Sequence, residues 1–405
     1  MHDDTRVSCG RENMNERLSV SFCLPEDRER ALLVGRAWVP ACEGPALVGV
    51  RGDDVVDLSP VTATASALLE LDDPVAAVRA ADNLPRLATL SDMVANSAWN
   101  RRSNAMPWLL APCDLQAIKA SGVTFVSSML ERVIEEQARG DPAKAESVRR
   151  SIVAVIGNDL AGVRPGSPEA VRLRDVLIEQ RAWSQYLEVG IGADAEIFTK
   201  AQPMSAVGLG AEVGIHPRSQ WSNPEPEIVL AVNSRGCTVG ATLGNDVNLR
   251  DFEGRSALLL GKAKDNNASC AIGPFIRLFD DSFTIDTVRG CELAMRVDGP
   301  EGYALEGQSS MAMISRDPLD LVGQAIGANH QYPDGLMLFL GTMFAPTQDR
   351  FQAGEGFTHV IGDIATVATP TLGALVNRVN RSDRIPPWSF GTGALMKNLA
   401  RRKVL

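Results

Sequence analysis

The chain has 405 residues, of which 45% are hydrophobic and 22% are charged, and its formal net charge is −10 at pH 7. This length allows one large domain or two ordinary ones, and the composition is that of a soluble globular protein. No stretch clusters Lys and Arg with interleaved aromatic residues, so nucleic acid is not an expected partner. No apolar run approaches the roughly 18 residues that span a bilayer, so we expect no membrane partner and, by default, a cytoplasmic location.

The first residues, MHDDTRVSCGRENMNERL, are polar and carry acids, unlike a secretory signal or an Arg-rich transit peptide. We predict that residues 1–18 form a disordered tail. The seven cysteines include no C-x-x-C pair, and the four histidines include no H-E-x-x-H motif. Neither a disulfide framework nor a histidine-rich zinc site is therefore expected.

The first part of the chain predicts a small mixed unit. Residues 30–60 alternate apolar patches with Gly and Pro, which is typical of short strands joined by turns. The Ala-rich stretch that follows has helical spacing, with Pro74 near a helix start. The run PWLLAPCDLQA at 107–117 indicates a connection, so we place a boundary near residue 110. We thus predict an N-terminal α+β domain over 19–110 and a larger domain over 111–405.

The larger unit begins with helical patterns and continues with β patterns. The first predicted helix, SSMLERVIEEQ, ends at the Gly-Asp-Pro of 140–142, and AKAESVRRSIVAVIG predicts the second. The run EAVRLRDVLIEQRAWSQYL predicts a third helix. Beyond residue 185 short β runs alternate with glycine turns, as in EIVLAVN and LMLFLGT. We find no internal repeat.

A pair of glutamates precedes one of these strands. In the run NPEPE at 223–227, Glu225 and Glu227 are two residues apart and share one face of an extended chain. Two carboxylates so close repel each other unless a cation compensates, and a hard divalent ion bound through oxygen is the natural choice. By itself, the pattern also fits a solvent-facing strand edge.

Two further motifs follow in order. The run GNDVNLRD at 244–251 comes directly after the apolar TVGATL, so Asp246 could end a strand and supply a third carboxylate. An Asx turn that caps the next helix is the alternative. The run GKAKDNNASC at 261–270 holds Lys262 and Lys264 among amides and small residues. A lysine near a metal cation and away from water has a lowered pKa, as a base requires; exposed lysines in a turn are the alternative.

In this order and spacing, the motifs resemble the fumarylacetoacetate hydrolase family. EIFTK at 196–200 resembles the family's strand ahead of the acidic pair, Leu340-Gly341-Thr342 its late substrate loop, and GFTHVIGDIATVATPTLGALVNRV its closing β segment. The resemblance covers about residues 115–385. It implies an α+β fold with a mixed β-roll catalytic domain, beside the smaller N-terminal α+β domain, and a homodimer.

Carried over residue by residue, the resemblance implies a metal site and a substrate site. Glu225, Glu227 and Asp246 would bind Mg²⁺, with Mn²⁺ as a possible substitute. Lys264 would lie beside the substrate, because it keeps the family's distance to Gly273-Pro274. The expected substrate-binding residues are Lys200, Gly341 and Thr342, together with His216 and Arg218 of IHPRSQW, the run just before the acidic pair. For His216 and Arg218, packing or surface roles stay open.

The family's water-activating pair is incomplete in this chain. Family members open the domain with G-x-N-Y-x-x-H-x-x-E, and the matching run at 122–131 keeps Glu131 but has Ser128 at the histidine position. A hydrolase that splits a carbon–carbon bond needs an activated water, so this departure argues against hydrolysis. The chain is similar instead to the family's dehydratase branch, which acts on 2-keto-3-deoxy-D-xylonate or D-arabinonate.

The resemblance implies dehydration of a small 2-oxo acid, 2-dehydro-3-deoxy-D-pentonate, to 2,5-dioxopentanoate in pentose breakdown. Lys264 would be the base at C3, and Glu131 the acid for the departing C4 hydroxyl. Hydrolysis of an acylpyruvate or another 2,4-diketo acid at the same metal site is the alternative. A third hypothesis is a catalytically inactive oligomer or a metabolite-binding module. The presence of all three predicted metal ligands and of Lys264 argues against it. Pentonate and hexonate are not distinguished.

Overall fold

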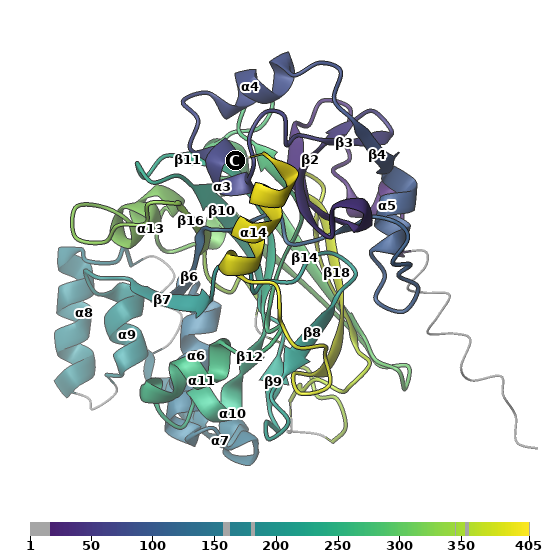
Figure 1. The fold of residues 1–405 in the computed structure, drawn as a ribbon. Coiled ribbons are helices and arrows are strands. Elements are labelled where there is room, and N and C mark those ends of the chain that lie inside the picture. Colours follow the sequence, from purple (N-terminus) through teal and green to yellow (C-terminus); the bar gives the residue numbers. More distant parts are fainter. Residues whose placement is uncertain (1–16, 157–162, 180–182, 345, 353–355, 405) are drawn as a thin grey trace, which may run out of the picture.

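The computed structural model describes residues 17–156, 163–179, 183–344, 346–352 and 356–404. Within these residues, an eleven-stranded sheet runs through the molecule in the order β4-β3-β2-β1-β13-β11-β10-β16-β6-β7, with β5 paired to β1 (Figure 1). Its strands are β1 (Leu33–Val39), β2 (Gly44–Arg51), β3 (Asp54–Asp57), β4 (Arg86–Thr89), β5 (Trp108–Leu109), β6 (Ala117–Gly122), β7 (Glu196–Ala201), β10 (Pro226–Val232), β11 (Thr238–Asp246), β13 (Cys270–Leu278) and β16 (Leu336–Phe339).

A second sheet packs against the middle of the first. Its order is β15-β14-β17-β18-β8, and β8 joins β18 in parallel while the other pairs are antiparallel. A short pair, β9 (Ser222–Asn223) with β12 (Asn248–Leu249), lies beside the acidic motifs. The strands of the second sheet are β8 (Glu212–Ile215), β14 (Glu292–Asp298), β15 (Ala304–Ser310), β17 (Ile364–Thr369) and β18 (Gly373–Arg381).

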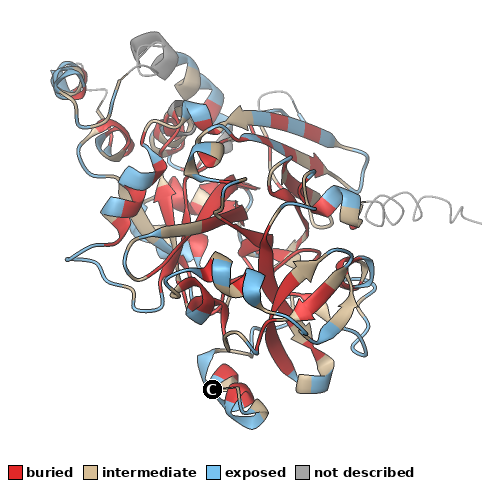
Figure 2. Cartoon of the chain, turned by 90° about the horizontal axis from the view of Figure 1, so that it is seen from above, coloured by how far each residue is buried: buried red, intermediate tan, exposed pale blue. Residues whose placement is uncertain are grey.

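The core explains why β10 is apolar without a break from Ile228 to Val232. Ile228, Leu230 and Val232 join a cluster that also contains side chains of the second sheet, whereas Val229 and Ala231 join a cluster with residues of the N-terminal segment. A strand that is covered on both faces reads as continuously hydrophobic. All seven of its residues are buried, and Figure 2 shows buried strands through the centre of the molecule. The predicted α+β fold of β-roll type is confirmed.

The N-terminal segment continues the large sheet. Leu33 and Val34 of β1 pair with Arg277 and Ile276 of β13, so the predicted boundary near residue 110 falls within one continuous sheet. Most of the predicted tail lies outside the described residues. Its last residue, Leu18, is buried in the core. Leu18 therefore belongs to the folded part of the chain, which was predicted to start at residue 19.

Helices cover the ends and edges of the sheets. Pro74 begins its helix as predicted, with Asp73 capping the helix by accepting from Ala76 N at 2.8 Å. The helices of the first half are α2 (Val20–Cys23), α3 (Ala65–Leu69), α4 (Pro74–Ala80), α5 (Leu90–Asn96), α6 (Val126–Ala138), α7 (Pro142–Ile156), α8 (Pro168–Glu179) and α9 (Gln185–Ile191). Those of the second half are α10 (Arg250–Glu253), α11 (Leu260–Lys264), α12 (Ile285–Arg289), α13 (Pro318–Ala325) and α14 (Thr392–Arg402).

Two helical predictions need correction. The third predicted helix is two helices, α8 and α9, because Ser184 caps a new start and its side chain accepts a hydrogen bond from Tyr186 N. Lys264 ends the short helix α11, where the sequence indicates a turn or loop. In the described part of the chain, no helix has both the length and the apolarity that crossing a membrane requires.

Candidate functional site

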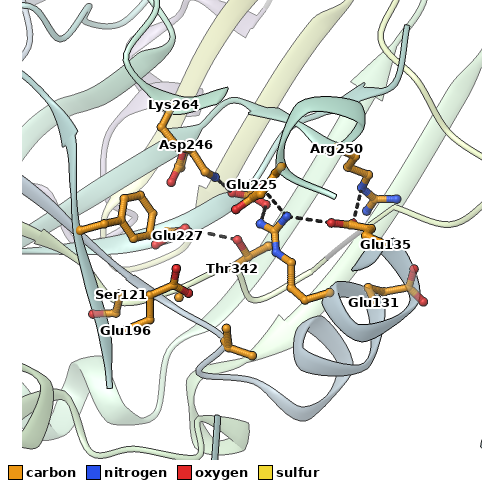
Figure 3. A pocket seen from close by; sticks show the side chains of 15 residues that line it. Ser121, Glu131, Glu135, Glu196, Glu225, Glu227, Asp246, Arg250, Lys264 and Thr342 are labelled. Atoms are coloured by element: carbon orange, nitrogen blue, oxygen red, sulfur yellow. Dashed lines mark hydrogen bonds and ion pairs between the residues drawn. The ribbon is translucent and has the colours of Figure 1, made fainter. Parts of the chain in front are cut away.

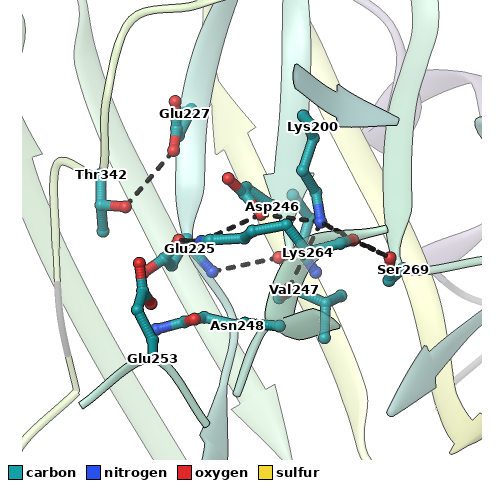
Figure 4. Close-up of polar contacts among 12 residues, drawn as sticks. Lys200, Glu225, Glu227, Asp246, Val247, Asn248, Glu253, Lys264, Ser269 and Thr342 are labelled. Atoms are coloured by element: carbon teal, nitrogen blue, oxygen red, sulfur yellow. Dashed lines mark hydrogen bonds and ion pairs between the residues drawn. The ribbon is translucent and has the colours of Figure 1, made fainter. Parts of the chain in front are cut away.

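Three carboxylates meet at the ends of β10 and β11. Glu225 immediately precedes β10, Glu227 is its second residue, and Asp246 is the last residue of β11. One oxygen of each side chain lies within 4.8 Å of the others, and all three residues are buried (Figure 4). The structure therefore brings together the three residues that the sequence predicts as metal ligands.

The register of the strands explains this meeting. Glu225 and Glu227 lie on one face because side chains alternate along a strand. Glu227 pairs with Gly244 across the two antiparallel strands, and Asp246 N donates to Glu225 O at 3.0 Å. Opposed residues of an antiparallel pair share a face. Asp246 thus faces the same side as the two glutamates.

Positive side chains of the protein contact two of the three carboxylates. Lys264 Nζ lies 2.5 Å from Glu225 Oε2 and 3.2 Å from Asp246 Oδ1. Lys200 Nζ lies 2.9 Å from Asp246 Oδ1, and Arg132 Nη2 contacts Glu225 Oε1. These contacts hold the carboxylates in place without neutralising all of them.

Glu227 forms no ion pair with any described residue. Its Oε2 accepts a hydrogen bond from Gly341 N at 2.7 Å, and its Oε1 accepts one from Thr342 Oγ1 at 3.3 Å. Burial, together with the charges of Asp246 and Glu225, raises the pKa of Glu227 well above its ordinary value. A divalent cation bound among the three carboxylates would relieve this repulsion.

The charges and the space of the pocket fit such a cation. When all groups are ionised, six acids face four bases, which leaves two negative charges. The pocket holds about 20 Å³ of free space, enough for one water-sized particle, and carboxylate oxygens suit a hard ion such as Mg²⁺. Apart from Glu131, which has its own arginine, the acids that line the pocket are Glu135, Glu196, Glu225, Glu227, Asp246 and Glu253. The bases in contact with them are Arg132, Lys200, Arg250 and Lys264.

Lys264 lines the pocket at the edge of the triad, and its side chain is 1% exposed. Burial lowers the pKa of Lys264, but the charges of Asp246 and Glu225 outweigh burial and hold the pKa above its ordinary value. The sequence predicts a lowered pKa on the assumption of a nearby cation. The pKa of Lys264 shifts upward instead, because carboxylates of the protein itself surround this lysine. A cation bound to those carboxylates would weaken their pull on the ammonium.

Lys200 does not line the pocket, contrary to its predicted contact with substrate. The side chain is fully buried behind Asp246, and Nζ donates to Lys264 O at 2.8 Å and contacts Val247 O at 3.4 Å (Figure 4). The reason is a bulge in β7. Ile118 pairs with Ala201 and Lys119 with Thr199, so Lys200 is left between two paired residues, and the alternation that puts Glu196 and Phe198 on the pocket face is interrupted there. Lys200 thus supports Asp246 and the end of α11 from the interior.

The late loop reaches the triad through its backbone and one hydroxyl. Gly341 has a φ of +102°, a conformation that favours glycine, and an added Cβ would lie 1.9 Å from Thr124 Oγ1. Thr342 lines the pocket. The structure thus brings Thr342 to the pocket surface, and Gly341 positions it by bonding Glu227.

The two predicted acid–base residues of α6 lie on the helical side. Glu131 lines the pocket, but Arg149 of α7 holds both of its oxygens, with Nη2 at 2.7 Å from Oε2 and 3.0 Å from Oε1. In Figure 3 the Glu131 carboxylate lies away from the triad. Ser128 belongs to the first turns of α6, and its side chain is outside the described structure.

An ion network that the sequence reasoning missed joins α6 to the triad. Arg132 contacts Glu225 through Nη2, and its Nη1 lies 2.9 Å from Glu135 Oε2 and 2.5 Å from Glu253 Oε2. Glu135 in turn lies 3.1 Å from Arg250 Nε (Figure 3). The i, i+3 spacing of Arg132 and Glu135 in LERVIEE was the available local signal. It could not reveal Glu253, which is 121 residues away.

Glu196 is a second residue that sequence reasoning missed. It begins β7 and lines the pocket opposite α6, and its carboxylate lies over Gly122, where an added Cβ would be 1.8 Å from Oε2. Burial raises the pKa of Glu196 to about 7, and the charge of Glu253 acts in the same direction. The signal was the alternation within EIFTK, which puts Glu196 and Phe198 on one face, and both line the pocket.

The structure does not bring His216 or Arg218 to the pocket. His216 Nδ1 accepts a hydrogen bond from Arg218 N at 3.2 Å, and its ring lies 5.2 Å from that of Phe252. Arg218 is exposed. Both residues follow β8 in a turn, where they have packing and surface contacts.

No protein-family model matches the chain. Over 176 residues the chain is 30% identical to a 2-dehydro-3-deoxy-D-arabinonate dehydratase of Saccharolobus solfataricus; this match covers 43% of the chain but 58% of that relative. Over 258 residues it is 29% identical to a probable 2-keto-3-deoxyxylonate dehydratase of Haloferax volcanii, covering 63% of the chain and 86% of the relative.

Solved structures share the fold. A 2-keto-3-deoxy-D-arabinonate dehydratase complexed with magnesium and 2,5-dioxopentanoate matches with a TM-score of 0.60 at 19% identity, over 86% of this chain and 99% of that one. A fumarylacetoacetate hydrolase of Exiguobacterium antarcticum matches with a TM-score of 0.53 at 15% identity, over 87% and 100% of the two chains. Together with the relatives, these matches confirm the predicted resemblance to the dehydratase branch of the fumarylacetoacetate hydrolase family.

Proposed function

From this similarity and the site, we propose that the chain is a magnesium-dependent hydro-lyase that converts 2-keto-3-deoxy-D-pentonate into 2,5-dioxopentanoate. The observation that carries the proposal is the buried triad of Glu225, Glu227 and Asp246 with Lys264 in contact with two of its members. We extend the proposal to a role in pentose breakdown and to a cytoplasmic homodimer, whose mass light scattering would report.

The proposed reaction removes one water from the substrate. When bound by the triad, Mg²⁺ would polarise the C2 carbonyl and so make the C3 hydrogens more acidic. Lys264 takes a proton from C3, and the C4 hydroxyl departs with a proton from an acid. A proton then moves from C5 to C3, and the resulting enol becomes the C5 aldehyde. Thr342, at the pocket surface, is proposed to orient the substrate carboxylate.

The acid has to be protonated before the hydroxyl leaves. Arg149 engages both carboxylate oxygens of Glu131, whereas burial raises the pKa of Glu196 to about 7. We therefore propose Glu196 as the acid and keep Glu131, the residue expected from the sequence, as the alternative. A group with a pKa near the working pH is suited to proton transfer.

Hydrolysis of an acylpyruvate is the second candidate, because the same triad could bind a 2,4-diketo acid. The residue that would activate water in a hydrolytic relative is Ser128 here. A serine hydroxyl does not act as an independent base at neutral pH. For this reason dehydration is the preferred function.

The proposal is tested by incubating the pure protein with Mg²⁺ and a set of 2-keto-3-deoxy acids, pentonates and hexonates of both C4 configurations. We expect mass spectrometry to show loss of one water from a pentonate, and none after treatment with a chelator. A protein that binds Mg²⁺ but leaves every such acid unchanged would refute the proposed activity.

A further inference from the structure

Arg132 is the pocket arginine that an incoming ligand can reach. Its side chain is 11% exposed, compared with 3% for Arg250 and 1% for Lys264. Arg250 is bound by Glu135 and Asn223, and Lys264 is enclosed between two carboxylates of the triad. Among the described residues that line the pocket, Arg132 therefore offers the accessible positive charge.

The two ends of the Arg132 guanidinium have different partners. Nη1 is anchored by Glu135 at 2.9 Å and by Glu253 at 2.5 Å. Nη2 contacts Glu225, a predicted metal ligand. If Glu225 gives its oxygens to a cation, the Nη1 anchor remains and the Nη2 end loses its partner. A guanidinium fixed at one end and free at the other is suited to receive an anion.

A small molecule that carries a carboxylate needs a positively charged side chain to bind in this pocket. The excess of acids repels any anion, and the pocket has room for about one water-sized particle, so a side chain must shift when a 2-oxo acid enters. Cation binding would itself loosen the contact between Arg132 and Glu225. Space, charge and hydrogen-bonding capacity would then become available at the same place.

We propose that Arg132 moves its Nη2 end from Glu225 to the carboxylate of the bound 2-oxo acid. Arg132 is thus a specificity-determining residue that selects acids over their neutral derivatives, and in the absence of ligand it competes with the cation for Glu225. The inference rests on the proposed function only for the class of ligand, a 2-oxo acid.

Isothermal titration of the Mg²⁺-loaded protein with pyruvate and with pyruvamide tests this inference without any turnover. Both probes carry the 2-oxo group, but only pyruvate carries the negative charge. We expect the wild type to prefer pyruvate, and Arg132→Met to reduce the ratio of the two affinities by about tenfold or more, the worth of a charge-assisted hydrogen bond. Arg172→Met, at an exposed pair on α8, controls for loss of a positive charge and should keep the ratio.

Titration with Mg²⁺ alone gives the second readout. Because Arg132 competes for Glu225, Arg132→Met should bind Mg²⁺ at least as tightly as the wild type. An unchanged pyruvate-to-pyruvamide ratio, or weaker Mg²⁺ binding with that ratio unchanged, overturns the inference. Should Arg132→Met fail to fold, because Glu253 loses its arginine and Glu135 keeps only Arg250, Arg132→Lys provides the deciding measurement. Arg132→Lys keeps the positive charge but lacks the planar guanidinium with its paired N–H donors. The pyruvate-to-pyruvamide affinity ratio of this variant should therefore fall, and an unchanged ratio refutes the inference.

The outcomes also separate this inference from the proposed function. A protein that prefers pyruvate through Arg132 but dehydrates no 2-keto-3-deoxy acid supports the inference and refutes the reaction. If the protein dehydrates the pentonate and both Arg132 variants keep the wild-type preference for pyruvate over pyruvamide, the reaction is supported and the inference about Arg132 is refuted.

Discussion

The two walls of the pocket hold their side chains in different ways. On the sheet wall, the register of β10 and β11 fixes Glu225, Glu227 and Asp246, because the backbone pairing dictates which side chains share a face. On the helical wall, Arg132 of α6 is held by carboxylates from other elements. A position on a strand is thus set locally, whereas the direction of a long charged side chain on a helix depends on partners that fold against it.

This difference predicts unequal responses to mutation. Removal of a sheet-wall ligand should abolish the site, because two carboxylates remain at fixed positions with no third ligand. Removal of a helical-wall group should change rates or preferences and leave the metal site formed.

Asp246→Ala should abolish both Mg²⁺ binding and dehydration. The change removes one of three carboxylate ligands and leaves Lys200 and Lys264 without a shared partner. Isothermal titration and a turnover assay provide the measurement, and Asp265→Ala, at an exposed aspartate directly after α11, is the matched control. Full activity of the Asp246 variant after dialysis against chelator would show that the ligands lie elsewhere.

Glu196→Gln should lower kcat by roughly two to four orders of magnitude, the range for a general acid, while Mg²⁺ binding is kept. Glu131→Gln, on the helical wall, should cost about tenfold, because it breaks the pair with Arg149 that holds α6 to α7. Steady-state rates at saturating Mg²⁺ compare the two, with exposed Glu146→Gln as control. The reverse order of effects would return the acid role to Glu131.

The pH dependence of stability should reveal Glu196 on its own. Its pKa is raised from 4.5 to about 7 in the folded chain. The stability that its neutral form provides is therefore fully present below about pH 4.5 and is lost as the pH rises through 7. Because Gln mimics the neutral form, Glu196→Gln should gain a few degrees in Tm over the wild type at pH 8 and less at pH 5, both in chelator. Equal differences at the two pH values would mean that Glu196 titrates normally.

The same contrast explains what could be predicted from the sequence. The E-x-E spacing and the strand that ends in Asp246 carry their geometry locally, so a carboxylate cluster was a candidate, whereas the full ligand set and the β-roll were predicted from the resemblance to the family. The alternation in EIFTK would place Lys200 on the pocket face with Glu196 and Phe198. Its burial behind Asp246 depends on the bulge where β7 pairs with β6, which the local pattern does not show. The roles of Arg132 and Glu196 depend on Glu253 and on burial, which arise only when distant segments meet. The break between α8 and α9 could have been predicted if Ser184 had been recognised as the N-cap of α9.

The central claim is that this site removes water from its substrate and does not use water to cleave it. The most direct measurement supplies equal amounts of 2-keto-3-deoxy-D-pentonate and acetylpyruvate to the Mg²⁺-loaded protein and follows all products by mass spectrometry. The account predicts 2,5-dioxopentanoate from the pentonate, with acetylpyruvate left intact. Pyruvate and acetate accumulating from acetylpyruvate while the pentonate persists would contradict it.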